Sequence, residues 1–277
     1  AVADVPRQIA NANTLFNVAN TLLFIGFTGV FAKMAEKMVP ERPAPPPDVI
    51  IEPRFLDESA LKAPSVALEQ VRLEFGRAGQ IARDMMVDLR QAVVERRRQE
   101  LVHIAQRDDE VDILEERILE YLAKLRQEAL TEKESRDHQA LMAAVVNLES
   151  AADVVETDLV GLADRALDGE YEPSDRTRDL LTQLFTTVEG SLGLAVTAVR
   201  DNDVQAAESV LAMKERIRRL TDDLLARKAE RLGRSEPEFL AAARIEMSFV
   251  DKLRHLYTLS KRIAKEVLPE TVAAKVD

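Results

Sequence analysis

The sequence predicts an all-α protein in which one N-terminal transmembrane helix is followed by a long helical bundle. Three observations favour this fold class. The 277 residues include only 9 Gly and 11 Pro, long stretches are rich in residues that favour helices, and apolar residues recur every three or four positions after Lys62. No segment shows the sustained alternation of apolar and polar residues that is typical of strands. We therefore expect helices and no sheet.

Residues 8–32 form a window without any ionisable side chain, between Arg7 and Lys33. About 20 predominantly apolar residues are enough to span the hydrocarbon core of a bilayer. We interpret residues 1–39 as a transmembrane segment, within which polar side chains would face other protein or a wet cavity. These side chains are Asn11, Asn13, Asn17 and Asn20. A signal peptide is the rival interpretation, but its apolar region would be shorter and would end at a small-residue cleavage site.

Basic residues are more frequent after this window than before it, where Arg7 stands. Those that follow are Lys33, Lys37, Arg42 and Arg54. An excess of Lys and Arg marks the cytoplasmic side of a transmembrane helix. We therefore expect the protein in the inner (plasma) membrane, with the remainder of the chain in the cytoplasm.

Residues 40–62 contain six prolines, which fix the backbone torsion φ and remove hydrogen-bond donors. This composition predicts a semi-rigid, extended linker between the membrane segment and the bundle. A ligand for a proline-recognition domain is the alternative interpretation of the same stretch.

Residues 63–268 are predicted to form a bundle of helices that each bury one apolar face. Thr131 with Glu134, and Ser235 with Glu238, fit the capping box that begins a helix. The expected helices span residues 64–97, 100–129, 132–168, 175–200, 203–232 and 236–267. Residues 269–277 are expected to form a flexible tail.

The six helices form two triplets with a similar outline, residues 63–168 and 175–268. In the second helix of each triplet, an acidic start is followed by apolar residues in similar phase. Val111, Leu114 and Ile118 in the first triplet correspond to Ile217, Leu220 and Leu224 in the second. A duplicated three-helix unit would explain this pattern.

The charge and the cysteine count exclude several classes of protein. The formal net charge of -11 makes a general nucleic-acid-binding surface improbable, and the absence of Cys removes disulfides, thiolate zinc sites and cysteine nucleophiles. The chain contains no GxSxG, HExxH or Gly-rich phosphate-binding motif. We therefore expect no enzymatic activity, and we expect His103, His138 and His255 at the surface or at an interface.

A resemblance to a known family rests on two stretches, PRQIANANTLFNVANTLLFIGFTGVFAKMAEKMVP and FLDESALKAPSVALEQVRLE. They look like the last membrane segment and the cytoplasmic start that follows it in the bacterial sodium/phosphate cotransporter family. The helical triplets resemble the PhoU-like domain that is fused behind those transporters. The resemblance covers essentially the whole chain, although Asn13 stands where the family usually has His.

The resemblance implies that the chain is the C-terminal portion of a sodium-dependent phosphate transporter, with a PhoU-like domain that regulates phosphate uptake. The expected partners are then the membrane and an upstream transporter core, whose substrate-binding Gln-Ser-Ser motifs are not present in this chain. A homodimer is a further expected association. The alternative function is a membrane-tethered helical scaffold or signalling protein that acts through a partner.

PhoU proteins are known for acidic ExxxD motifs that bind metal, and Glu149 and Asp153 match this spacing. Carboxylates four residues apart share one helix face and suit a hard cation. Asp109 and Asp112 on the preceding helix are the expected additional ligands, for a divalent or ferric cation. A solvated acidic face beside the apolar core is the alternative interpretation.

A second, weaker candidate site lies in the second triplet. Asp251 and His255 form a DxxxH variant of the motif on its third helix. The second helix, however, places Arg218 where Asp112 of the first triplet would align. We therefore expect metal binding in the first triplet rather than in the second.

Overall fold

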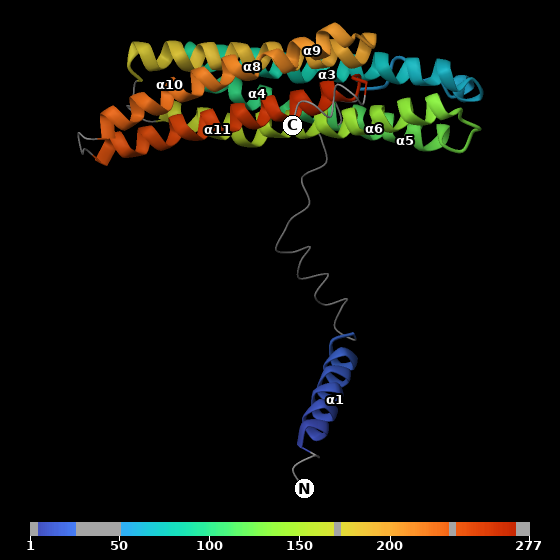
Figure 1. The fold of residues 1–277 in the computed structure, drawn as a ribbon. Helices are drawn as coiled ribbons and strands as arrows, with labels where there is room; N and C mark the ends of the chain where they lie inside the picture. Colours follow the sequence, from blue (N-terminus) through green and yellow to red (C-terminus); the bar gives the residue numbers. More distant parts are fainter. Residues whose placement is uncertain (1–4, 26–50, 169–172, 233–236, 270–277) are drawn as a thin grey trace. The chain divides into compact units, whose positions relative to one another are not determined.

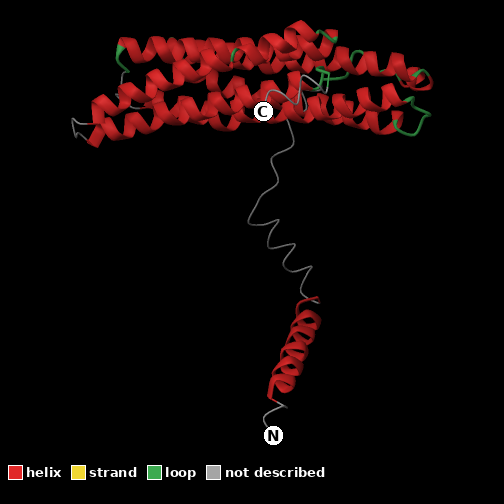
Figure 2. Cartoon of the chain, in the orientation of Figure 1, coloured by secondary structure: helices red, strands yellow, loops and turns green. Residues whose placement is uncertain are grey.

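The computed structural model describes residues 5–25, 51–168, 173–232 and 237–269. The chain divides into two compact units, residues 1–47 and 48–277, and each is considered by itself. The described residues form helices joined by turns and loops, without a strand (Figure 2). The predicted all-α fold class is therefore confirmed.

The first unit contains helix α1, Val5–Ile25, with 21 residues. No helix within the described ranges is both long enough and apolar enough to cross a membrane. The prediction of a transmembrane helix is therefore not supported in this part of the chain. The physical reason is the polar content of α1, which includes Asn13, Asn17 and Asn20. Residues 26–32, the end of the predicted window, lie outside the described residues.

The second unit consists of long helices that run side by side (Figure 1). Its elements are η1 (Glu58–Lys62), α3 (Pro64–Val94), η2 (Arg98–Glu100), α4 (Leu101–Gln106), α5 (Asp108–Leu125), α6 (Glu132–Asp153), η3 (Val154–Leu159), α7 (Val160–Asp168), α8 (Asp175–Asp201), α9 (Val204–Ala212), α10 (Lys214–Leu232) and α11 (Pro237–Lys265).

Local sequence signals explain where several helices begin and end. Thr131 accepts a hydrogen bond from the Glu134 backbone N–H, while the Glu134 carboxylate accepts from the Thr131 N–H. This confirms the predicted capping box at the start of α6. Asn202 ends α8 with a left-handed φ of 51°, and Asp203 caps α9. The capping box predicted at Ser235 lies outside the described residues.

Two predicted helices are interrupted near their starts. The break in the first of them falls at Arg107, between α4 and α5, and the break in the second falls at Met213, between α9 and α10. The predicted helix 132–168 is helical throughout but contains a π-helical turn, η3. Such turns are uncommon and occur frequently at functional sites.

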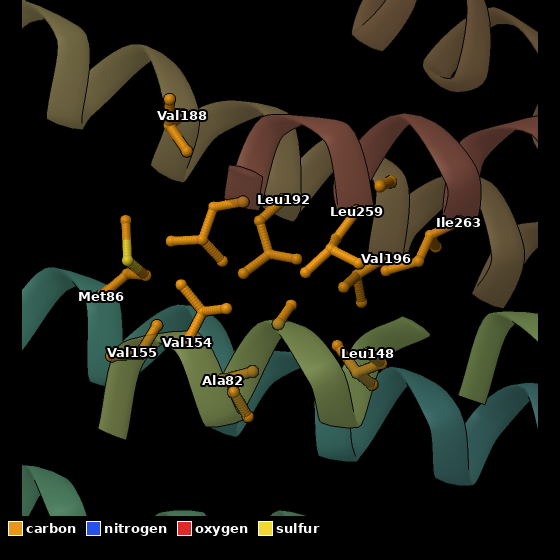
Figure 3. Packing of buried hydrophobic residues seen from close by; sticks show 14 of the residues in the cluster. Ala82, Met86, Leu148, Val154, Val155, Val188, Leu192, Val196, Leu259 and Ile263 are labelled. Carbon is orange, nitrogen blue, oxygen red and sulfur yellow. The ribbon is translucent and has the colours of Figure 1, made fainter. Parts of the chain in front are cut away.

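The core lies between α3, α6, α8 and α11, because α8 packs against both α3 and α11 and α6 packs against the same two helices. Figure 3 shows apolar side chains from these helices and from η3 meeting in one layer. The labelled residues are Ala82, Met86, Leu148, Val154, Val155, Val188, Leu192, Val196, Leu259 and Ile263, all buried. Burying a side chain such as Leu or Met contributes about 1.5–3 kcal/mol, so this layer is a main source of stability.

A close approach of α3 to α8 depends on a glycine. A Cβ atom added to Gly79 would lie 2.5 Å from both Cγ atoms of Val196. Since these atoms belong to a short, branched side chain in the core, the clash would force the helices apart. Gly79 therefore fixes the spacing of two central helices.

The chain that precedes α3 is attached to the bundle, although residues 40–62 were predicted to form a linker. The side chain of Glu74 on α3 is fully buried and accepts hydrogen bonds from the backbone N–H groups of Arg54 and Phe55, at 2.7 and 2.8 Å. Residues 51–62 therefore lie against the bundle rather than forming part of a spacer. The earlier residues of the predicted linker lie outside the described ranges.

The prediction that His138 lies at the surface or at an interface is wrong, because this residue is buried. Its side chain belongs to the buried face of α6 and is 4% exposed. Its Nε2 atom lies 2.9 Å from the backbone carbonyl oxygen of Leu122. The ring therefore joins α6 to the end of α5 and has a structural role.

Replacing Gly79 by Ala is expected to lower the free energy of unfolding by about 1–3 kcal/mol, because the new methyl group overpacks the core against Val196. Urea unfolding followed by circular dichroism measures this change. The matched control is Gly190→Ala on α8, where an added Cβ meets nothing within 4 Å. The control should gain about 0.5–1 kcal/mol from helix propensity. Equal stability of both variants would contradict the close approach.

Candidate functional site

The candidate site is an acidic cluster formed by Asp108, Asp153 and Glu156. Each residue offers one carboxylate oxygen, and these oxygens all lie within 4.8 Å of one another. Asp108 is the first residue of α5, Asp153 is the last residue of α6, and Glu156 lies in the π-helical turn η3. The site therefore forms where the start of α5 lies next to the transition from α6 to the π-helical turn η3.

Local sequence places these side chains. The break at Arg107 makes Asp108 the first residue of a new helix, and its side chain lies close to Asp153 at the end of α6. The π-turn keeps Val155 and Leu159 fully buried in the core while Glu156 stays half-buried at the edge. The apolar residues thereby hold the acidic ones in position.

Asp108 is the most unusual member of the cluster. Its side chain is 3% exposed, and its Oδ1 atom is buried without a hydrogen-bond partner. Burial, together with the nearby charges of Asp112, Glu156, Asp153 and Glu149, raises the pKa of Asp108 to about 8. Without a cation, this carboxyl group is therefore mostly protonated at neutral pH.

A second buried carboxylate in the same bundle provides a contrast. Glu74 is as deeply buried as Asp108, but both of its oxygens accept hydrogen bonds, from two backbone N–H groups and from Arg77. The hydrogen bonds of Glu74 explain how its carboxylate can be buried. The Oδ1 atom of Asp108 has no such hydrogen bond, and a bound ion would supply the missing partner.

Further carboxylates surround the cluster. Burial, followed by the charges of Asp153 and Asp112, raises the pKa of Glu149. Burial also raises the pKa of Glu115, with contributions from Glu149 and Asp112. These groups repel one another at neutral pH, so the region would be stabilised by positive charge.

Two basic side chains, Arg107 and Lys252, pair with other carboxylates. Arg107 precedes Asp108 but pairs with Asp88 of α3 at 2.9 Å, and Lys252 of α11 pairs with Asp158 at 2.7 Å. Asp158, which is close to Glu156 in the sequence, is therefore paired with Lys252. Neither Arg107 nor Lys252 is therefore an ion-pair partner of Asp108, Asp153 or Glu156 in these pairs.

Three converging carboxylates can coordinate a hard cation such as Mg²⁺, Ca²⁺, Mn²⁺ or Fe³⁺. Binding would require ionised ligands, so a cation would displace the proton from Asp108. Water molecules or Glu149 and Asp112 would complete the coordination. These carboxylates suit the binding of a cation, and their total charge changes when the cation binds.

The predicted ligands were Glu149, Asp153, Asp109 and Asp112. The structure places Asp153 in the cluster, while Glu149 and Asp112 flank it closely enough to raise the pKa of Asp108. Asp109 lies outside this set of three ligands.

Asp108 and Glu156 were not among the ligands predicted from the sequence. Asp108 and Asp112 are four residues apart, the same spacing as Glu149 and Asp153, and this signal was available in the sequence. The depth of burial of Asp108 was not available, because it depends on the packing of α5 against α6.

The second candidate pair, Asp251 and His255, lies one turn apart on α11, and both side chains are exposed. Neither belongs to a group of three metal-binding side chains within the described part of the chain. They instead line a groove between α10 and α11 together with Arg218.

The acidic cluster falls within a region shared with a known family. Residues 75–157 match the family model described as PhoU domain. The match includes all of α5 and α6 and the first turn of η3, and therefore all three members of the cluster. The PhoU-like character expected from the sequence is confirmed for this region.

Two similar curated proteins carry the description "Putative inorganic phosphate export protein YjbB". The protein from Salmonella typhimurium is 25% identical over 258 residues, which cover 93% of this chain and 47% of the relative. The protein from Escherichia coli is 26% identical with the same coverage. The chain thus spans about half the length of the curated relatives it matches.

The fold is also similar to solved structures. The crystal structure of PhoU from Pseudomonas aeruginosa has a TM-score of 0.67 at 16% identity, covering 72% of this chain and 94% of that chain. The phosphate transport system regulatory protein PhoU from Streptococcus pneumoniae has a TM-score of 0.64 at 14% identity, covering 74% and 94%. These likenesses establish a PhoU-like helical fold.

The raised pKa of Asp108 predicts a pH dependence of stability. The folded-state pKa of about 8 exceeds the ordinary value of 3.8, so the folded protein binds the proton more tightly than the unfolded chain. In the presence of a chelator, the free energy of unfolding should therefore fall as the pH rises from about 5 to about 8. Urea titrations across this range measure the fall.

The variant Asp108→Asn should show a shallower fall, because the amide does not ionise. Asp109→Asn is the matched control on the same helix and should keep the slope of the unmodified protein. If Asp108→Asn and Asp109→Asn had the same pH profile, Asp108 would not be the group that titrates.

Proposed function

We propose that this chain regulates phosphate movement through a membrane transporter and that its acidic cluster binds a divalent or ferric cation. The observation that carries the proposal is the position of the buried, unpartnered Asp108 carboxylate within the region that matches the PhoU domain. The relatives described as phosphate export proteins match nearly the whole chain, which supports a link to phosphate transport.

The transporter is proposed to couple phosphate movement to sodium, and the bundle is proposed to act on it from the cytoplasmic side of the inner membrane. The support for these finer points is the resemblance of the N-terminal stretch TLFNVANTLLF to the cotransporter family. A regulatory part must exist in two states that the transporter distinguishes. The charge of the acidic cluster, with or without a cation, supplies such a difference.

The two helical triplets are proposed to be copies of one unit. In the structure, the second long helix of each triplet is preceded by a short helix: α4 precedes α5, and α9 precedes α10. The breaks at Arg107 and Met213 lie one residue before Asp108 and Lys214. Matching breaks at matching places are expected after a duplication.

A second candidate function is a scaffold that binds a protein partner. The observation in its favour is the exposure of Met142 and Val146, which lie one turn apart on α6 and are 41% and 46% exposed. A scaffold would depend on this apolar surface, whereas the proposed regulator depends on the acidic cluster. Variants of the two surfaces therefore distinguish the functions.

Adding Mn²⁺, Mg²⁺ or Fe³⁺ to the metal-free chain should raise its melting temperature, because only the folded protein holds the three ligands together. At a free concentration of one hundred times Kd, the gain in the free energy of unfolding is about 2.7 kcal/mol. Calorimetry measures the shift. The double variant Asp153→Asn, Glu156→Gln should lose the response and keep its helicity. The control Asp251→Asn, His255→Gln should keep the response, and a melt that is independent of metal would refute the site.

Phosphate flux tests the regulatory role. Cells that express the complete transporter with Asp153→Asn and Glu156→Gln should show a phosphate flux that no longer responds to the cation, with a change of about fivefold or more for a coupling near 1 kcal/mol. Radioactive phosphate measured with and without sodium gives the direction and the coupling ion. The variant Met142→Ser, Val146→Ser serves as the comparison. An effect of this comparison alone would favour the scaffold.

A further inference from the structure

The helices α10 and α11 enclose a groove of about 470 Å³ whose charge is opposite to that of the whole protein. Its basic lining residues are Lys214, Arg218, Arg254 and Lys261, and its acidic lining residues are Asp222 and Asp251. Basic groups therefore outnumber acidic ones here, whereas the chain as a whole has 38 basic and 49 acidic residues. This local reversal suits an anion.

The wall of this basic groove contains a buried hydroxyl without a partner. Thr221 is 5% exposed, and its Oγ1 atom forms no hydrogen bond. Neighbouring buried hydroxyls are satisfied, since Ser260 donates to the Leu256 carbonyl at 3.0 Å and Tyr257 donates to the Val210 carbonyl at 3.1 Å. An orphaned hydroxyl costs about 1–3 kcal/mol, so Thr221 points to a ligand that would accept its hydrogen bond.

The basic groove occupies the place in the second triplet that the acidic cluster occupies in the first. On the second long helices, one constant spacing along the chain relates Asp108 to Lys214, Asp112 to Arg218 and Glu115 to Thr221. On the third helices, another constant spacing relates Glu149 to Asp251, Asp153 to His255 and Glu156 to Thr258. Carboxylates have thus been replaced by basic or hydroxyl side chains at five of these six positions.

We propose that the groove between α10 and α11 binds the phosphoryl group of a phosphate-type anion. Lys214 and Arg254 supply positive charge, and the Thr221 hydroxyl donates a hydrogen bond to a phosphoryl oxygen. Charge-assisted hydrogen bonds to phosphate are among the stronger polar contacts in proteins, and guanidinium and ammonium groups are the usual donors.

The roles of the arginines differ. Arg218 already pairs with Glu215 at 2.8 Å and with Asp222 at 3.4 Å, so its charge is partly used on its own helix. Lys214 and Arg254 form no salt bridge with another described residue, and they stand on the two different helices that border the groove. They are therefore the pair that a bound anion would bring together.

The source of the phosphoryl group is either inorganic phosphate or an organic phosphate. The apolar side chains of Ile217 and Leu225 also line the groove, which leaves room for the carbon part of a sugar phosphate. The inference does not rest on the proposed transport role, because binding is measured on this chain without a transporter. A failure of phosphate binding would leave the flux prediction untouched.

The test uses the full chain of 277 residues and isothermal titration calorimetry at constant ionic strength. Inorganic phosphate and glucose 6-phosphate are titrated in separate arms, and chloride is the reference anion. We expect saturable binding of at least one phosphate. The double variant Lys214→Gln, Arg254→Gln should weaken it about tenfold or more, equivalent to about 1.4 kcal/mol. Arg136→Gln, which changes an exposed arginine of α6, is the control and should bind normally.

Thr221→Val provides a second, independent measurement. Removing an orphaned hydroxyl should leave the melting temperature of the unliganded chain unchanged or higher, while weakening phosphate binding. A purely structural role of Thr221 would not produce these opposite effects. Tighter binding of glucose 6-phosphate than of inorganic phosphate would identify an organic phosphate as the ligand. Binding unaffected by the Lys214 and Arg254 changes, or a response to chloride equal to that for phosphate, would overturn the proposal.

Discussion

The structure depends on the close packing of α3 against α8, which Gly79 permits because it has no side chain opposite Val196. These two helices, together with α6 and α11, form the apolar centre of the bundle. The more polar helices α5 and α10 flank this centre, and each borders one of the two ligand sites that we propose.

Much of the fold was predictable from the sequence, because helices and their ends follow local rules. The apolar spacing gave most helix bounds to within a few residues, and Thr131 with Glu134 marked the start of α6. The interruptions at Arg107 and in η3 were not predictable, since neither contains the Pro or Gly that normally marks a break. They follow from the packing of complete helices.

The sequence predicted an acidic cluster between the second and third helices, but not which carboxylates form it. An ExxxD spacing predicted carboxylates at the end of α6, where the acidic cluster lies, because it reports which side chains share a helix face. The choice between Asp108 and Asp109 depends on the rotation of α5 about its axis, and that rotation is set by tertiary contacts. Hydrogen bonding then separates two buried carboxylates that look alike in the sequence, because Glu74 has its donors and Asp108 has an unpartnered oxygen.

The attachment of the preceding chain to Glu74 has a mechanical consequence. Two backbone N–H groups, those of Arg54 and Phe55, are held by one buried carboxylate in the first half of α3. Tension applied to the polypeptide before residue 51 would therefore reach a central helix directly, with little slack to absorb it. The same two hydrogen bonds would transmit force in the opposite direction, so that a displacement of α3 would pull on the chain that precedes residue 51.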